Sequence, residues 1–134
     1  MTQEEKQLLL QDICARLPYG VKAQYYSSEE EMLTVDTIEA IYTQPSVEIV
    51  IGQYGLEIED IKPYLRPLLS ITEKERVEYC DLQYKFLLGS HHPVTNGHPL
   101  FNWLNKKMFD YRGLIPKGLA ISTDKFNPYK DFKL

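Results

Sequence analysis

Short turns divide residues 21–61 into alternating segments, and the lengths of these turns leave few folds open to the chain. In each segment apolar and polar residues alternate, as expected for strands that bury one face. The segments are 21–25, 32–42, 47–51 and 56–58. Parallel strands need crossovers of a dozen or more residues, which these turns do not provide. We therefore predict an antiparallel sheet over residues 21–61, with a bulge or bend near Asp36, where the alternation changes phase.

Two Thr-x-x-Glu sequences predict where two helices begin. In this capping box the threonine hydroxyl and the glutamate carboxylate each accept a backbone N–H of the first turn. Thr2 with Glu5 and Thr72 with Glu75 have this spacing. Apolar residues then recur at helical spacing, so each helix is expected to bury one stripe in the core. The predicted helices span residues 1–17 and 72–88, and the core stripe of the second is Val77, Cys80, Tyr84 and Leu87.

A third helix is predicted over residues 99–112, because Pro99 suits a first helical turn and Gly113 suits the left-handed position that ends a helix. The other segments are a connector with two prolines at 62–71 and a tail at 122–134. We therefore predict a single α+β domain over residues 1–134. Its small antiparallel sheet could curl into an SH3-like, partly closed barrel, and it packs against two to three helices.

Charge and cysteine content indicate where the protein acts. A net charge of −4 argues against binding nucleic acid or anionic membranes through bulk charge, although the acidic residues concentrate in the first two-thirds of the chain. The sequence shows no signal peptide and no apolar run of membrane-spanning length. Cys14 and Cys80 lack a CxxC motif and are expected to be free, buried thiols. We predict a cytoplasmic protein with no membrane partner.

The sequence offers no coherent catalytic motif. Phosphate-binding glycine motifs and the nucleophile elbow are missing, and no cofactor is predicted. His91, His92 and His98 share one loop, but this loop contains no Asp, Glu or Cys that would complete a metal site. A hydrolase that uses this histidine loop is therefore the lowest-ranked hypothesis, and we expect a protein that is not an enzyme.

Aromatic and cationic residues provide the candidate binding sites. Trp103, Tyr111 and Arg112 fit two interpretations: packing around the end of the third helix, or a patch for a protein partner, since these residue types are common in binding hot spots. Tyr64 and Arg66, with Arg112 and Lys117, could instead form a local patch for single-stranded nucleic acid.

Three runs resemble a family of small uncharacterised proteins from gut anaerobes and their phages or other mobile elements. They are LPYGV at 17–21, IKPYLRPL at 61–68 followed by Thr72-Glu73, and FNWLNKKMFDYRGLIPKGLA at 101–120. The resemblance covers most of the chain and implies a cytoplasmic origin and a mobile-element context, but no known activity or catalytic residue. Family members often carry His where Lys107 or Met108 stands, so that position is not assigned a function.

These observations favour a non-enzymatic interaction or accessory module whose partner is a protein, and the resemblance implies a phage or mobile-element context. Ten tyrosines, more than a core of this size requires, point the same way. The alternative is a nucleic-acid-binding domain that uses the local Tyr, Arg and Lys patch. The two hypotheses differ in whether binding is sensitive to salt.

Overall fold

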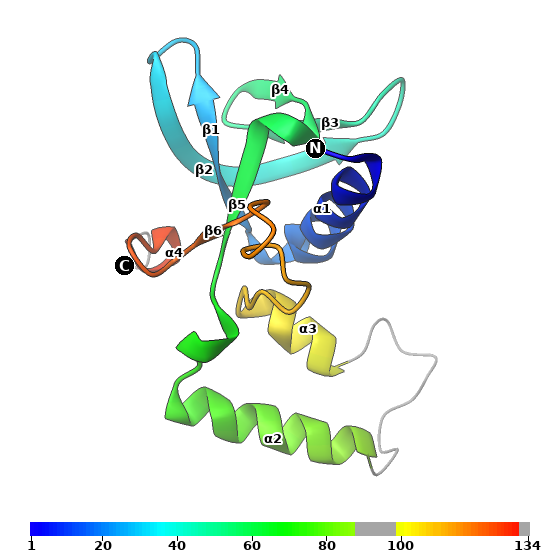
Figure 1. Ribbon diagram of the computed structural model, residues 1–134, viewed down its shortest axis with the longest axis vertical. Helices are drawn as coiled ribbons and strands as arrows, with labels where there is room; N and C mark the ends of the chain where they lie inside the picture. The colour runs from blue at the N-terminus through cyan, green and yellow to red at the C-terminus, as the bar shows by residue number, and fades with distance from the viewer. Residues whose placement is uncertain (88–98, 132–134) are drawn as a thin grey trace.

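The computed structural model describes residues 1–87 and 99–131 (Figure 1). Within these residues the helices are α1 (Gln3–Arg16), α2 (Glu73–Leu87), α3 (Pro99–Lys106) and α4 (Pro128–Asp131). The strands are β1 (Lys22–Ser27), β2 (Met32–Tyr42), β3 (Glu48–Ile51), β4 (Tyr54–Leu56), β5 (Ile61–Leu65) and β6 (Ile121–Ser122). Single 3₁₀ turns, named η1 (Leu17–Tyr19), η2 (Ile58–Asp60) and η3 (Leu68–Ser70), link some of these elements.

The sheet confirms the α+β class. Its strand order is β4-β3-β2-β1-β5-β6, and the described neighbours are antiparallel except for β5 and β6. The sheet is not closed, so the expected curling into an SH3-like barrel is not observed. The two end strands, β4 and β6, are only three and two residues long. They therefore expose few backbone groups with which to close a barrel.

Strand β2 joins the two halves of the sheet. Its first half pairs with β1 and its second half pairs with β3, and the register shifts between Ile38 and Ala40. The irregularity that we predicted near Asp36 therefore exists slightly later in the strand. A bulge increases the local twist of a strand, which lets one long strand serve both halves.

The predicted connector at 62–71 is partly wrong, because its first residues form strand β5 in the middle of the sheet. Pro63 lies opposite Ala23 of β1. A proline normally disfavours a central strand, since it has no N–H to donate. Here β6 pairs only with Tyr64 and Leu65, so the part of β5 that contains Pro63 has a single neighbouring strand. The missing donor is therefore tolerated.

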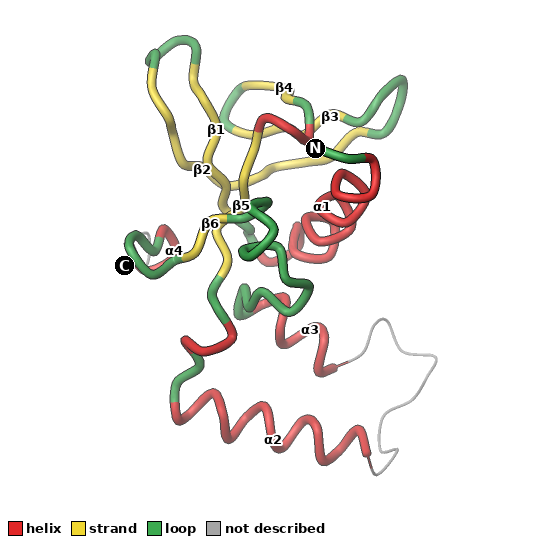
Figure 2. The backbone as a smooth tube through the Cα atoms, viewed as in Figure 1, coloured by secondary structure: helices red, strands yellow, loops and turns green. Residues whose placement is uncertain are grey.

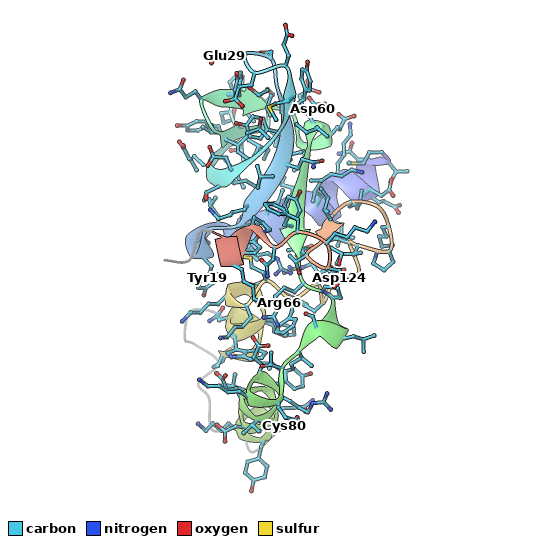
Figure 3. All side chains as sticks on the ribbon, turned by 90° about the vertical axis from the view of Figure 1, so that its left-hand side faces the viewer. Tyr19, Glu29, Asp60, Arg66, Cys80 and Asp124 are labelled. Carbon is cyan, nitrogen blue, oxygen red and sulfur yellow. The ribbon has the colours of Figure 1, made fainter. Side chains whose placement is uncertain are left out.

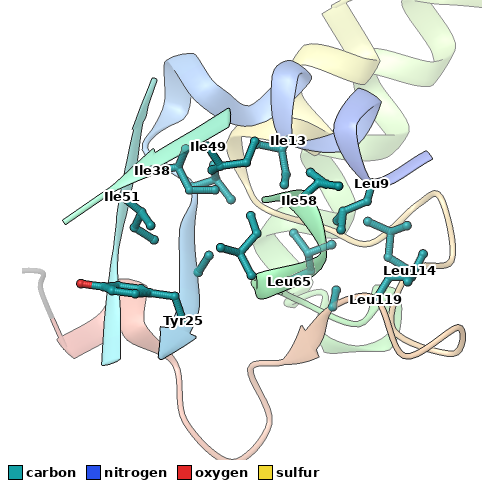
Figure 4. Close-up of a cluster of buried hydrophobic side chains, with 14 of the residues drawn as sticks. Leu9, Ile13, Tyr25, Ile38, Ile49, Ile51, Ile58, Leu65, Leu114 and Leu119 are labelled. Carbon is teal, nitrogen blue, oxygen red and sulfur yellow. The ribbon is translucent and has the colours of Figure 1, made fainter. Parts of the chain in front are cut away.

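The core lies between the sheet, α1 and the segment that follows α3 (Figure 4). Leu9 and Ile13 of α1 are fully buried against Ile49 and Ile51 of β3 and the neighbouring strands. Leu114, from the loop before β6, completes the other side of the cluster. The capping box of Thr2 and Glu5 is present as predicted, and it begins α1 at Gln3.

Helix α3 is shorter than predicted and ends at Lys106 rather than at residue 112. Met108 adopts a positive φ of 65°, which stops the helix before Gly113 is reached. The backbone of Arg66 then pairs with the chain on both sides of Phe109: Arg66 N–H donates to the Met108 carbonyl, and Asp110 N–H donates to the Arg66 carbonyl. This tertiary pairing extends the edge of β5 and replaces the last helical turns.

Helix α2 lies apart from the sheet, with α3 between them (Figure 2). The expected burial of its stripe is wrong for the residues that the structure describes, because Val77, Cys80 and Tyr84 are all exposed. Cys14 is also exposed, so the expectation of buried thiols is wrong as well. Together, α2 and α3 form the arm of the molecule.

The tail after β6 docks on the sheet. The Tyr129 hydroxyl accepts the Lys22 N–H at 3.0 Å and donates to the Tyr64 carbonyl at 2.7 Å. Phe126 packs edge-on against the Tyr64 ring. Burial raises the pKa of Tyr129 well above its ordinary value, so its hydroxyl keeps its proton as a donor. The tail is therefore part of the folded domain up to α4.

Candidate functional site

Phe109 is the centre of an aromatic and cationic cluster where the arm meets the body. Its side chain is fully buried. The Trp103 ring stacks on it with centroids 5.7 Å apart, and the Arg66 guanidinium lies 4.2 Å from its centroid. Trp103 in turn contacts Tyr79 of α2. This cluster links the arm to Arg66 at the end of β5.

Arg66 and Glu75 form a bidentate ion pair in this cluster. Both nitrogen–oxygen distances are 2.7 Å, and Arg66 also donates to the Ser70 carbonyl. Glu75 closes the second predicted capping box, since it accepts the Thr72 N–H while Thr72 accepts the Glu75 N–H. The Arg66 hydrogen bonds lower the pKa of Glu75 to about 2, although partial burial acts in the opposite direction. Glu75 is therefore ionised at neutral pH.

Asp12 joins two arginines from distant parts of the chain. Its carboxylate accepts two hydrogen bonds from Arg16, one turn later in α1, and one from Arg112. Arg16 also donates to the carbonyl of Phe109, and its Nη1 is buried with no partner among the described residues. The cluster of Asp12, Arg16 and Arg112 thus holds α1 to the segment after α3.

The run DYRGLI at 110–115 has a structural role at this junction. The Asp110 carboxylate accepts the N–H groups of Leu114 and Ile115 at 2.8 and 2.9 Å, which fixes the turn. The Tyr111 hydroxyl donates to the Asn105 side chain, and the Arg112 guanidinium lies 4.5 Å from the Tyr111 ring centroid. These contacts explain why the segment follows a defined path over α1.

Some of the predicted binding residues are brought together and others are not. Arg66 and Trp103 contact Phe109, Tyr111 lines the same apolar cavity as Phe109, and Arg112 lies against Tyr111. Tyr64 is buried on β5 beneath the tail. Lys117 is exposed, and its charge acts on Glu5 at the start of α1, away from the arm. The patch of Tyr64, Arg66, Arg112 and Lys117 therefore does not form a single surface.

A separate groove of about 590 Å³ lies where the arm, the tail and η1 meet. Figure 3 labels three of its residues, Tyr19, Arg66 and Asp124, at the level between the sheet and α2. Its cationic residues other than Arg66 are Lys106 and Lys107 at the end of α3 and Lys130 of α4. These lysines define the lysine groove.

Sequence reasoning missed the lysine groove because its residues are far apart in the chain. Lys106 and Lys107 are also expected at the end of any helix, where they complement its dipole. The one signal was the charge distribution: after residue 98 there are seven Lys and Arg against three Asp and Glu, whereas before it there are eight against sixteen.

The arm carries a smaller apolar cavity of about 280 Å³. It is lined by Leu68, Ile71, Tyr79, Leu104, Phe109 and Tyr111. Leu69, which follows the lining residue Leu68 in η3, is 97% exposed and does not line the cavity. The cavity and this leucine lie near the N-terminal end of α2, close to the Arg66–Glu75 pair.

His91, His92 and His98 lie outside the described residues, so the hydrolase hypothesis stays a prediction. Within residues 1–87 and 99–131, no group of three or more His, Cys, Asp and Glu side chains is placed to hold a metal ion. Among the described helices, none has the length and apolar character that crossing a membrane requires. No protein-family model, curated protein or solved structure matches this chain.

Proposed function

We propose that this protein is a non-enzymatic interaction module that binds a helix of another protein on the outer face of α2. The observation that carries this proposal is the exposure of Val77 and Tyr84, which are 68% and 63% accessible. They are two helical turns apart on one face, with exposed Cys80 between them. Such a stripe is typical of a helix that is covered by another element.

The attachment of α2 supports the same proposal. An isolated helix of about 15 residues is marginally stable in water. In the described part of the chain, α2 is tied to the body by the Arg66–Glu75 pair in its first turn and by the contacts of Tyr79 and Glu78 with Trp103. The outer face therefore adds no packing energy of its own until a partner covers it.

The spacing of the stripe indicates what kind of partner fits. Residues at i, i+3 and i+7 form a seam that accepts the apolar face of a second helix. A phage or mobile-element accessory role, as implied by the resemblance of the sequence, is compatible with such a module.

Site-specific crosslinking tests this proposal. A photoreactive amino acid is placed at Val77 and, as a control, at Glu39, which is exposed on β2. We expect a discrete crosslinked protein from position 77 in cells that contain the native partners and none from position 39. The additional substitution Tyr84→Asp should abolish this product without changing the fold, since Tyr84 is exposed.

Each other result counts against the proposal. Equal crosslinking from positions 77 and 39, or none from position 77, would contradict a binding face on α2. A product of twice the mass of the chain, identified by mass spectrometry as a second copy, would replace the proposed partner with self-association.

A further inference from the structure

The charges in the lysine groove are not balanced. Of its lining residues, Arg66 and Glu75 neutralise each other in the ion pair. Lys106, Lys107 and Lys130 make no salt bridge with any described residue, and Asp124 is the one remaining carboxylate in the lining. The groove therefore has an excess of two positive charges, whereas the protein as a whole is acidic.

The arginines of the chain contrast with these lysines. Arg16 and Arg112 pair with Asp12, Arg66 pairs with Glu75, and the exposed Arg76 lies 4.0 Å from Glu73. The arginines are thus engaged with carboxylates of the same chain. The three lysines of the groove lie near one another and make no salt bridge with a described residue. They are therefore available to bind an external anion.

The groove also presents an aromatic ring and neutral hydrogen-bonding groups. Tyr19 lines it and is 38% exposed, and its ring makes no aromatic contact with another described residue. Thr123 and Asn127 line the side formed by the tail. An exposed ring beside several lysines is the combination that binds unpaired bases and phosphates together. A double helix would leave the ring unused, because its bases are stacked inside.

From this arrangement we infer that the lysine groove binds single-stranded nucleic acid, with Lys106, Lys107 and Lys130 on the phosphates and Tyr19 against a base. The site differs from the patch predicted from the sequence, and it is separate from the outer face of α2. Neutralising three phosphates of a single strand predicts that log K falls with log salt with a slope of about −2.

Two triple variants with the same charge test the inference. The first is Lys106→Gln, Lys107→Gln and Lys130→Gln, which neutralises the groove. The control is Lys62→Gln, Lys74→Gln and Lys117→Gln, which removes three exposed lysines outside the groove. The probe is a fluorescent 15-nucleotide oligothymidylate, titrated with the full-length protein at several low salt concentrations.

We expect the groove variant to lose at least roughly tenfold in affinity and most of the salt dependence, and the control to stay within about twofold of the parent protein. Tyr19→Ala should weaken binding roughly tenfold without changing the salt slope, because stacking releases no counterions. Val77→Asp should leave binding unchanged, which separates this site from the protein-binding face.

Three results would overturn the inference. One is the absence of binding by the parent protein at low salt. Another is an equal loss in the two triple variants, which would show that bulk charge alone is responsible. The third is competition by thymidine monophosphate at the same concentration as the oligonucleotide, which would make the groove a site for a free nucleotide instead of a strand.

Discussion

The Arg66 guanidinium stacks over Phe109 while its two terminal nitrogens hold the Glu75 carboxylate, each at 2.7 Å. One side chain therefore connects the end of β5, the segment after α3 and the first turn of α2. Because Glu75 also closes the capping box with Thr72, the ion pair is joined to the first turn of α2. The position of the arm depends on this pair.

Glu75→Gln should lower the free energy of unfolding by about 2 kcal/mol. The substitution leaves a largely buried guanidinium without its counter-charge, which costs more than the loss of an exposed pair. Glu73→Gln is the matched control, since its partner Arg76 is exposed and 4.0 Å away, and it should change stability by less than about 0.5 kcal/mol. Urea unfolding of both variants gives the comparison, and equal effects would contradict the role of the pair.

The same pair should make stability depend on pH in the acidic range. The pKa of Glu75 is lowered from 4.5 to about 2, so folding favours its ionised form. The resulting stabilisation is fully present above pH 4.5 and is lost as the pH falls towards 2. The stability difference between the parent protein and Glu75→Gln should therefore shrink over this range in urea titrations. A difference that stays constant down to pH 2 would show that the charge of Glu75 is not responsible.

Asp12→Asn should destabilise the protein by about 3 kcal/mol or more, because it leaves buried Arg16 and partly buried Arg112 without a counter-charge. Asp81→Asn removes a carboxylate at the same i, i+4 spacing from Lys85, but that pair is more than half exposed. This control should cost less than about 0.5 kcal/mol. Thermal and urea unfolding measure both, and a small effect of Asp12→Asn would mean that solvent reaches the two arginines.

Local features were predictable from the sequence, since their causes are local. The capping boxes of Thr2 and Thr72 use partners three residues away, and the short turns fix antiparallel neighbours; both predictions are confirmed. The end of α3 was not predictable, because the chain beyond Lys106 is captured by Arg66 from another part of the sequence. Arg112 likewise pairs with Asp12, which is 100 residues away. The sequence shows that such residues are charged, but it does not show which residue forms an ion pair or a hydrogen bond with each of them.

The lysine groove and the outer face of α2 likewise could not be recognised as binding sites from the sequence alone. Lys106 and Lys130 come from α3 and α4, and only the docking of the tail places them on one groove. Val77 and Tyr84 recur at helical spacing, yet such a stripe does not reveal whether the same chain or a different one covers it. The position of α2 leaves both side chains exposed among the residues that the structure describes.

Two valines provide a direct test of where α2 lies. Val77 of α2 is 68% exposed, whereas Val21, before β1, is fully buried in the core cluster. Val21→Ala removes the same atoms as Val77→Ala but leaves a cavity, so it should lower the free energy of unfolding by about 2 kcal/mol. Val77→Ala should change it by less than about 0.5 kcal/mol, as for other exposed positions. If urea unfolding of the isolated protein gave similar losses for both variants, the outer face of α2 would be packed within the chain itself. It would then not be free to bind a partner helix.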